Sequence, residues 1–244
     1  MDGALRIAHK DAVWLEGETF RGVFLGASDT KEVPVVILVP GLDSSQIEFA
    51  SNAAALRRRG LSTLTIDGPG QGILAPFTHP RVDYEVVVSD AIDALLSTGR
   101  RPSGFGILAL SLGGFYGARA LAYESRLLAG VTVSGPSKIV WRDLPPLLKE
   151  ILVLRTGSAY AAEVFSDQID LTDLAPSISQ PLLVVDGQSD VIPGYASGEF
   201  LAAKSKRGQY LPIPQGDHLV GNARWKWLPI AADFLKEQLV SRAG

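Results

Sequence analysis

Cysteine is absent from the 244 residues, which excludes disulfide frameworks, zinc–thiolate sites and a cysteine nucleophile. A chain without cysteine is consistent with a reducing compartment. The composition, 46% hydrophobic and 20% charged, is that of an ordinary globular protein. A chain of this length buries a large core, so its stability requires neither disulfides nor a metal ion.

An excess of basic residues is also lacking, since 23 lysines and arginines face 26 acidic residues, a formal net charge of −3. The one basic run, Arg57–Arg59, ends a predicted helix, where cations complement the helix dipole. Nothing therefore indicates a nucleic-acid partner. The longest apolar runs are too short to cross a bilayer, and the first residues do not resemble a signal peptide. We expect a soluble cytoplasmic protein with no membrane partner, and the sequence leaves a homodimer open.

Short apolar runs alternate with helical patterns along most of the chain. Residues 35–39 form a continuous apolar run, as in a strand buried on both faces. Similar runs cover residues 61–66, 105–110, 128–133, 182–185 and, more weakly, 210–213. Apolar residues at helical spacing over 84–96 predict a helix that Gly99 ends. This alternation predicts an α/β fold with a mostly parallel central sheet and helices on both faces. Two or three short antiparallel strands are expected earlier, within residues 5–25.

Residues 136–180 interrupt this alternation. The segment has no clear strand, a helix is expected only around Ala161, and a loop of this length in a compact domain is usually functional. We interpret it as a small helical lid inserted in a single domain of residues 1–244. Its apolar residues are expected to line a substrate pocket: Trp141, Leu144, Leu147 and Leu148.

One serine follows a predicted strand and opens a predicted helix. Two residues before and after Ser111 stand Ala109 and Gly113, in the sequence Leu-Ala-Leu-Ser-Leu-Gly-Gly. A tight strand-to-helix turn needs small residues at both positions, and it holds the serine hydroxyl clear of the sheet. The pattern predicts Ser111 as a nucleophile; the alternative is a glycine-rich turn with an incidental serine.

A serine hydroxyl needs a base, and the chain has only three histidines. His9 and His79 precede the serine, whereas this arrangement places the acid and then the histidine after the nucleophile. The predicted general base is therefore His218, in a loop between the last strand and a C-terminal helix.

Two aspartates follow the predicted strand 181–185 and are candidates for the acid. Asp186 ends that strand and is expected to brace the turn. Asp190 lies further out, so we prefer it as the residue that holds the imidazole tautomer and stabilises the imidazolium.

Acyl transfer also needs donors for the developing oxyanion. The backbone N–H of Leu112, next to the serine, is one candidate. The other is the N–H of Leu42, in the loop where Gly41 allows close approach. Residues 67–72 (Asp-Gly-Pro-Gly-Gln-Gly) lack the dinucleotide fingerprint and are interpreted as a structural turn near the site. No metal-ligand cluster is seen, and no cofactor is expected.

Three of these stretches together carry a family resemblance: residues 40–44 (Pro-Gly-Leu-Asp-Ser), 67–72, and 111–116 (Ser-Leu-Gly-Gly-Phe-Tyr). Over roughly residues 33–240 the chain resembles the α/β-hydrolases related to 2,6-dihydroxypseudooxynicotine hydrolase and to the fermentation-respiration switch protein. The resemblance implies the α/β-hydrolase fold, and Asp190 and His218 match the family's acid and histidine positions. Members of that group include esterases and hydrolases that break a carbon–carbon bond beside a ketone.

The leading prediction is a serine hydrolase that acts through an acyl-enzyme on Ser111. Its substrate would be a hydrophobic or aromatic small molecule with a carboxyl ester or a ketone-activated carbon–carbon bond. Acyl transfer or lactone closure, in which a substrate hydroxyl replaces water, stays open with the same residues. A non-catalytic ligand-binding module on this scaffold is the remaining alternative.

Overall fold

The computed structural model describes residues 12–28, 30–192 and 198–240. The strands within these ranges form one eight-stranded sheet. The strand order is β1-β2-β4-β3-β5-β6-β7-β8. At one edge, β1 (Val13–Glu16) and β2 (Arg21–Leu25) are antiparallel to their neighbours, and every later pair is parallel. The predicted mostly parallel sheet is therefore confirmed.

The parallel strands agree closely with the apolar runs of the sequence. They are β3 (Val35–Val39), β4 (Ser62–Asp67), β5 (Phe105–Leu110), β6 (Leu127–Val133), β7 (Pro181–Gly187) and β8 (Arg207–Ile213). Along β3, Val35 and Ile37 pack into one core and Val36 and Leu38 into the other, because successive side chains of a strand point to opposite faces. Two early strands are confirmed by β1 and β2, and residues 5–11 of that prediction lie outside the described residues.

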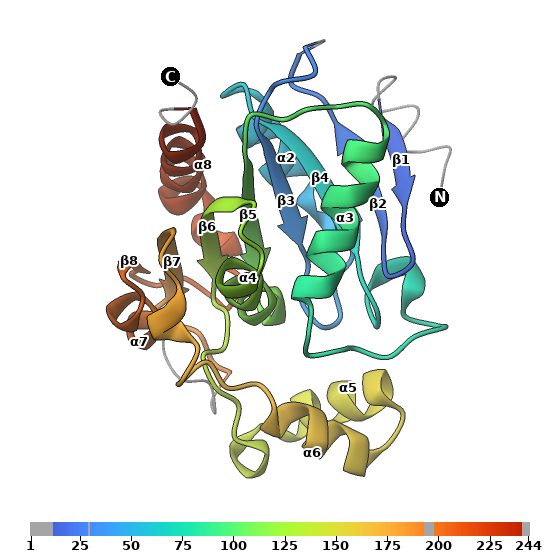
Figure 1. Cartoon of the computed structure of the whole chain (residues 1–244). Helices are drawn as coiled ribbons and strands as arrows, with labels where there is room; N and C mark the ends of the chain where they lie inside the picture. The colour runs from blue at the N-terminus through green and yellow to red at the C-terminus, as the bar shows by residue number, and fades with distance from the viewer. Residues whose placement is uncertain (1–11, 29, 193–197, 241–244) are drawn as a thin grey trace.

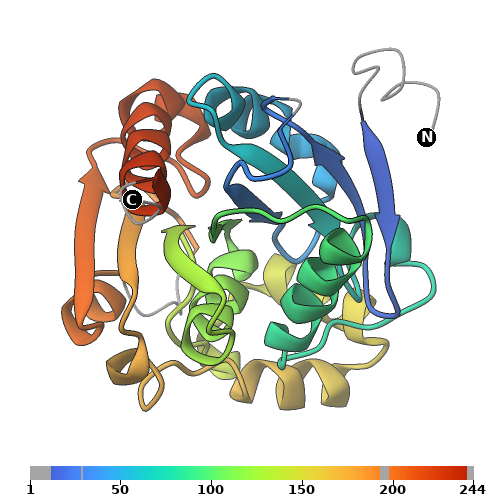
Figure 2. The same cartoon turned by 45° about the horizontal axis from the view of Figure 1, so that its top comes forward.

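Helices cover both faces of the sheet, as predicted (Figures 1 and 2). One face carries α3 (Glu85–Ser97), α4 (Leu112–Tyr123) and α7 (Gly198–Lys204), and the other carries α2 (Ala50–Arg57) and α8 (Arg224–Val240). In α3 the buried residues recur at helical spacing, and Gly99 follows with a positive φ of 81°. Among the helices of the described ranges, none has the length and hydropathy that a transmembrane span requires.

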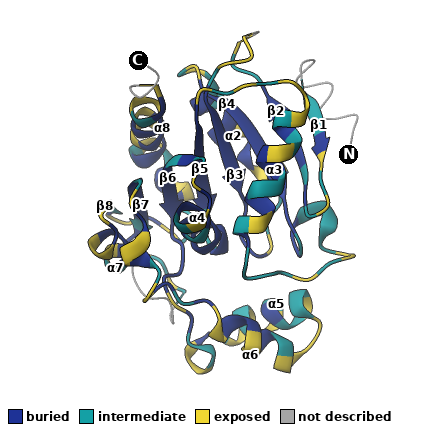
Figure 3. Ribbon diagram, in the orientation of Figure 1, coloured by how far each residue is buried: buried dark blue, intermediate teal, exposed yellow. Residues whose placement is uncertain are grey.

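Residues 136–180 leave the sheet after β6 and return to it in β7. They form η3 (Trp141–Asp143), α5 (Pro146–Thr156), α6 (Ala159–Asp167) and η4 (Ala175–Ser177). Figure 1 shows α5 and α6 beyond the ends toward which the central strands point. At the base of the segment, Ile139 N–H donates to Ile169 O at 2.9 Å and Leu171 N–H to Ser137 O at 2.7 Å. Figure 3 shows the strands mostly buried, whereas these helices carry many exposed residues.

The helix α5 is absent from the sequence-based prediction, which placed a helix only around Ala161. The consecutive prolines at 145 and 146 suggest a break, but Pro146 stands at the start of the helix. The missing N–H of proline is not needed in the first turn, so proline begins a helix well. Gly157, with φ of 88°, ends it.

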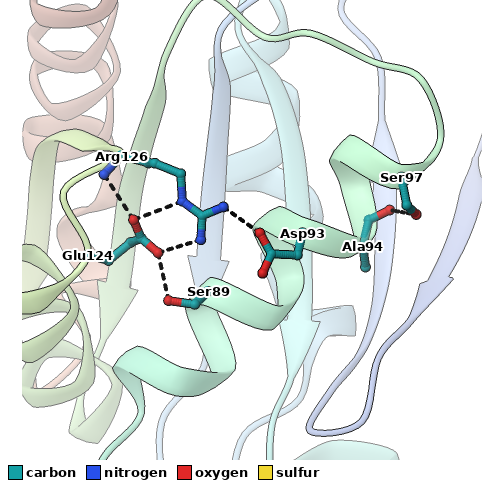
Figure 4. Close-up of polar contacts among 6 residues, drawn as sticks. All are labelled: Ser89, Asp93, Ala94, Ser97, Glu124 and Arg126. Carbon is teal, nitrogen blue, oxygen red and sulfur yellow. Dashed lines mark hydrogen bonds and ion pairs between the residues drawn. The ribbon is translucent and has the colours of Figure 1, made fainter.

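An ion cluster joins α3 to the end of α4 (Figure 4). Glu124 is 7% exposed and accepts hydrogen bonds from the Arg126 guanidinium at 2.9 and 2.6 Å and from the Ser89 hydroxyl at 2.6 Å. Arg126 also pairs with Asp93 on α3. The hydrogen bonds from Arg126 lower the pKa of Glu124 to about 2. This cluster lies away from the strand ends that carry the site, and its role is structural.

Candidate active site

Ser111 occupies the turn between β5 and α4 in a strained backbone conformation. Its φ of 54° and ψ of −130° are rarely adopted by a residue with a side chain. The turn is closed by Ser111 N–H, which donates to Val133 O at 2.8 Å, and by Gly114 N–H, which donates to Ser111 O at 2.7 Å. This is the conformation that a nucleophile elbow requires.

Small residues around the elbow permit this close packing. A side chain on Gly113 would place Cβ 2.5 Å from the carbonyl oxygen of Val39. The other small position is Ala109, whose Cβ would lie 2.9 Å from a Cβ on Gly117 of α4. Alanine is tolerated on the strand because the facing helix residue is glycine.

The structure brings Ser111, His218 and Asp190 together. Ser111 Oγ lies 2.8 Å from His218 Nε2, and His218 Nδ1 lies 2.7 Å from Asp190 Oδ2. A carboxylate accepts hydrogen bonds only, so Nδ1 carries the proton and Nε2 accepts from the serine hydroxyl. The three side chains form one chain of hydrogen bonds at the carboxyl edge of the sheet.

The loops that carry the aspartate and the histidine are joined through their backbones. Gln188 N–H donates to Ile213 O at 3.0 Å, and Ser189 N–H donates to Gly216 O at 2.9 Å. A side chain on Gly187 would come within 2.1 Å of a carbonyl oxygen of the histidine loop. Because β7 and β8 are parallel neighbours, their following loops remain in contact beyond the sheet.

Asp186, the other acid candidate, bonds elsewhere. Its Oδ2 accepts a hydrogen bond of 2.8 Å from the N–H of Gly198, the first residue of α7. Burial raises the pKa of the Asp186 carboxyl. The side chain braces the start of α7, and Asp190 is the aspartate that contacts His218.

The two predicted oxyanion donors have no partner within the described ranges. Neither the N–H of Leu42 nor that of Leu112 donates a hydrogen bond to the described residues, although both residues are buried. Unpaired buried N–H groups are rare and call for an explanation. A Cβ on Gly41 would lie 3.0 Å from Ser111 Cβ and 3.5 Å from Ser111 Oγ, so the Leu42 loop passes directly beside the serine.

The four apolar residues predicted for the pocket lie in different environments. Leu144 is 3% exposed and belongs to the main core. Trp141 and Leu148 are partly buried and pack against that core. Leu147 is 69% exposed on α5. Trp141 and Leu148 are therefore the two that combine partial exposure with packing against this core.

One side chain near the site has no function in the sequence-based interpretation. Gln71, in the turn after β4, donates to the carbonyl oxygens of Pro40 and Gly41 in the loop after β3. These contacts follow from the sheet order: β3 and β4 are parallel neighbours, so the turns that follow them lie side by side.

Residues 36–183 match the sequence profile of the alpha/beta hydrolase family, and the chain belongs to that family. The 2,6-dihydropseudooxynicotine hydrolase of Paenarthrobacter nicotinovorans is 28% identical over 214 residues, which cover 85% of this chain and 58% of that protein. The chain thus spans less than two thirds of the length of this relative.

Solved structures share the fold. A crystal structure of 2,6-dihydroxy-pseudo-oxynicotine hydrolase has a TM-score of 0.83 and 24% identity, covering 95% of this chain and 68% of that one. Est1E from Butyrivibrio proteoclasticus, solved with ferulic acid bound, has a TM-score of 0.71 and 15% identity, covering 94% of this chain and 100% of that one. The predicted α/β-hydrolase fold is confirmed.

Proposed function

We propose that this protein is a serine hydrolase whose nucleophile is Ser111. The observation that carries the proposal is the hydrogen-bonded series Ser111–His218–Asp190, with distances of 2.8 and 2.7 Å. The strained backbone of the serine supports the same conclusion, and so do the N–H groups of Leu42 and Leu112, which have no partner among the residues that the structure describes. Membership of the alpha/beta hydrolase family supports the reaction class.

The reaction proceeds through an acyl-enzyme. The Ser111 oxygen attacks the substrate carbonyl carbon while its proton passes to His218 Nε2, and Asp190 stabilises the imidazolium. The N–H groups of Leu42 and Leu112 donate to the developing oxyanion. The bond to the leaving group then breaks, and the leaving oxygen or carbon takes the proton from His218. Water, deprotonated by His218, attacks the acyl carbon; the bond from that carbon to Ser111 Oγ breaks, Oγ takes the proton back from His218, and the acid is released.

The substrate we propose is a hydrophobic or aromatic small molecule with a carboxyl ester or a ketone-activated carbon–carbon bond. The apolar residues Trp141 and Leu148, on the segment beyond the strand ends, support this choice. A relative with ferulic acid bound, an aromatic acid, and a relative that hydrolyses a pseudooxynicotine are consistent with it. The segment 136–180 would then act as a lid over Ser111.

A fluorophosphonate probe tests the proposal directly. The wild-type protein is expected to be labelled at Ser111 and to hydrolyse p-nitrophenyl butyrate. Ser111→Ala should lose labelling and at least about 10³-fold in kcat while it stays folded. Ser97→Ala is a control, since that hydroxyl lies on α3 and donates to Ala94 O (Figure 4).

The products separate the alternatives. An aromatic 1,3-diketone reports carbon–carbon cleavage, and an added alcohol that captures the acyl group reports acyl transfer. Absence of both labelling and turnover in folded wild-type protein would support the ligand-binding module and refute the proposal.

A further inference from the structure

Gln71 is a fully buried glutamine whose carboxamide is completely bonded. The residue is 1% exposed. Its Nε2 donates to Pro40 O at 2.6 Å and to Gly41 O at 3.1 Å. Its Oε1 accepts from the Tyr84 hydroxyl at 2.6 Å and from Gly68 N–H at 3.0 Å. Two donors and two acceptor positions are all used, and the exchanged orientation would set oxygen against two carbonyl oxygens.

One of these bonds acts on the peptide that carries the proposed oxyanion donor. The carbonyl of Gly41 and the N–H of Leu42 belong to the same peptide unit, and no cis peptide occurs in the described residues. In a trans peptide the C=O and the N–H point in opposite directions. The bond from Gln71 to Gly41 O therefore directs the Leu42 N–H away from Gln71, and it also polarises that N–H as a donor.

The tyrosine that donates to Gln71 is itself held in place. Tyr84, which donates to Gln71, stacks on Tyr116 of α4 with ring centroids 4.1 Å apart and planes 10° apart. The turn after β4 thus connects the helix that follows Ser111 to the loop after β3.

We infer that Gln71 is a positioning residue, which holds the Gly41–Leu42 peptide so that its N–H faces the oxyanion on Ser111. This inference rests on the proposed function. Gln71 acts through the Gly41–Leu42 peptide and not on the substrate itself. Its loss should therefore reduce the stabilisation of the transition state and leave substrate binding in the ground state intact. Donors that are mispositioned lose most of their effect, because oxyanion stabilisation depends on preorganised geometry.

The test is Gln71→Met, a variant of similar size without hydrogen-bonding groups. We expect kcat for p-nitrophenyl butyrate to fall by about 10- to 100-fold, up to the loss of one oxyanion donor, with KM changed less than about twofold. Gln46→Met is the matched control, because it removes a buried amide that does not bond to the Gly41 carbonyl. A crystal structure of Gln71→Met should show the Gly41–Leu42 peptide rotated.

The outcomes separate this inference from the proposed function. A wild-type protein without turnover or fluorophosphonate labelling overturns the proposed function. An active wild type with unchanged kcat in Gln71→Met, or a variant structure with the peptide in place, overturns this inference alone. If Gln71→Met does not fold, Tyr84→Phe serves in its place: it removes one bond to the Gln71 carboxamide and should lower kcat by about 2- to 10-fold at constant KM. A loss of kcat in Gln46→Met as large as in the Gln71 or Tyr84 variant would indicate a merely structural role and overturn the inference.

Discussion

Asp190 and Asp186 lie four residues apart, and the same substitution at each tests which one serves His218. In Asp190→Asn, the amide can present an N–H group to His218 Nδ1 in place of the carboxylate at 2.7 Å. The imidazole then carries its proton on Nε2 and cannot accept the proton of Ser111. In the serine-protease example of this substitution the loss is about 10⁴-fold, so we expect about 10³- to 10⁴-fold in kcat/KM, or about 4–5.5 kcal/mol.

Asp186→Asn should behave differently. The asparagine oxygen can still accept the Gly198 N–H, which is 2.8 Å from Asp186 Oδ2. Because burial raises the pKa of Asp186, its ionised form opposes folding at pH 7. The variant should therefore keep or gain thermal stability at pH 7, and this difference should vanish as the pH falls through the folded-state pKa. We expect less than about a tenfold loss in kcat/KM.

The assay is hydrolysis of p-nitrophenyl butyrate between pH 5 and pH 9, with thermal unfolding of both variants followed by circular dichroism. Folded Asp186→Asn with a larger loss than Asp190→Asn would refute the assignment of the acid. Equal and small losses would refute the participation of His218 in its proposed tautomer.

Three further substitutions give separate expectations. Gly41→Ala should lower kcat/KM by at least about tenfold with little change in Tm, because the new Cβ would lie 3.0 Å from Ser111 Cβ; full activity would contradict this packing. Trp141→Ala should change the preference between aromatic and aliphatic p-nitrophenyl esters by about 1–3 kcal/mol. Leu147→Ala should leave this preference unchanged, because Leu147 is exposed. The same preference in both variants would refute a lid that contacts substrate. Glu124→Gln should lower the free energy of unfolding in urea by about 1–3 kcal/mol at pH 7. This difference from wild type should shrink as the pH falls from about 4.3 toward about 2, because protonation of Glu124 removes the charge that Arg126 stabilises. A difference that stays constant with pH would contradict the lowered pKa of Glu124.

Local patterns were sufficient to predict much of this fold. The strand β3 is a continuous apolar run because both of its faces are buried, so it is visible without knowledge of its neighbours. The turn at Ser111 was recognisable because tight backbone geometry restricts residue size within a few positions. The helix α5 escaped prediction because two prolines at its start resemble a break.

Local patterns also limited the choice of site residues, since only one histidine follows Ser111 in the chain. They could not show that His218, 107 residues from Ser111, reaches it, or which aspartate contacts the imidazole. Those contacts depend on strand order and on the loops that join β7 and β8. Gln71 depends on tertiary structure in the same way: its bonds to Pro40 and Gly41 exist because β3 and β4 are neighbours in the sheet, and no periodicity within the chain encodes that adjacency.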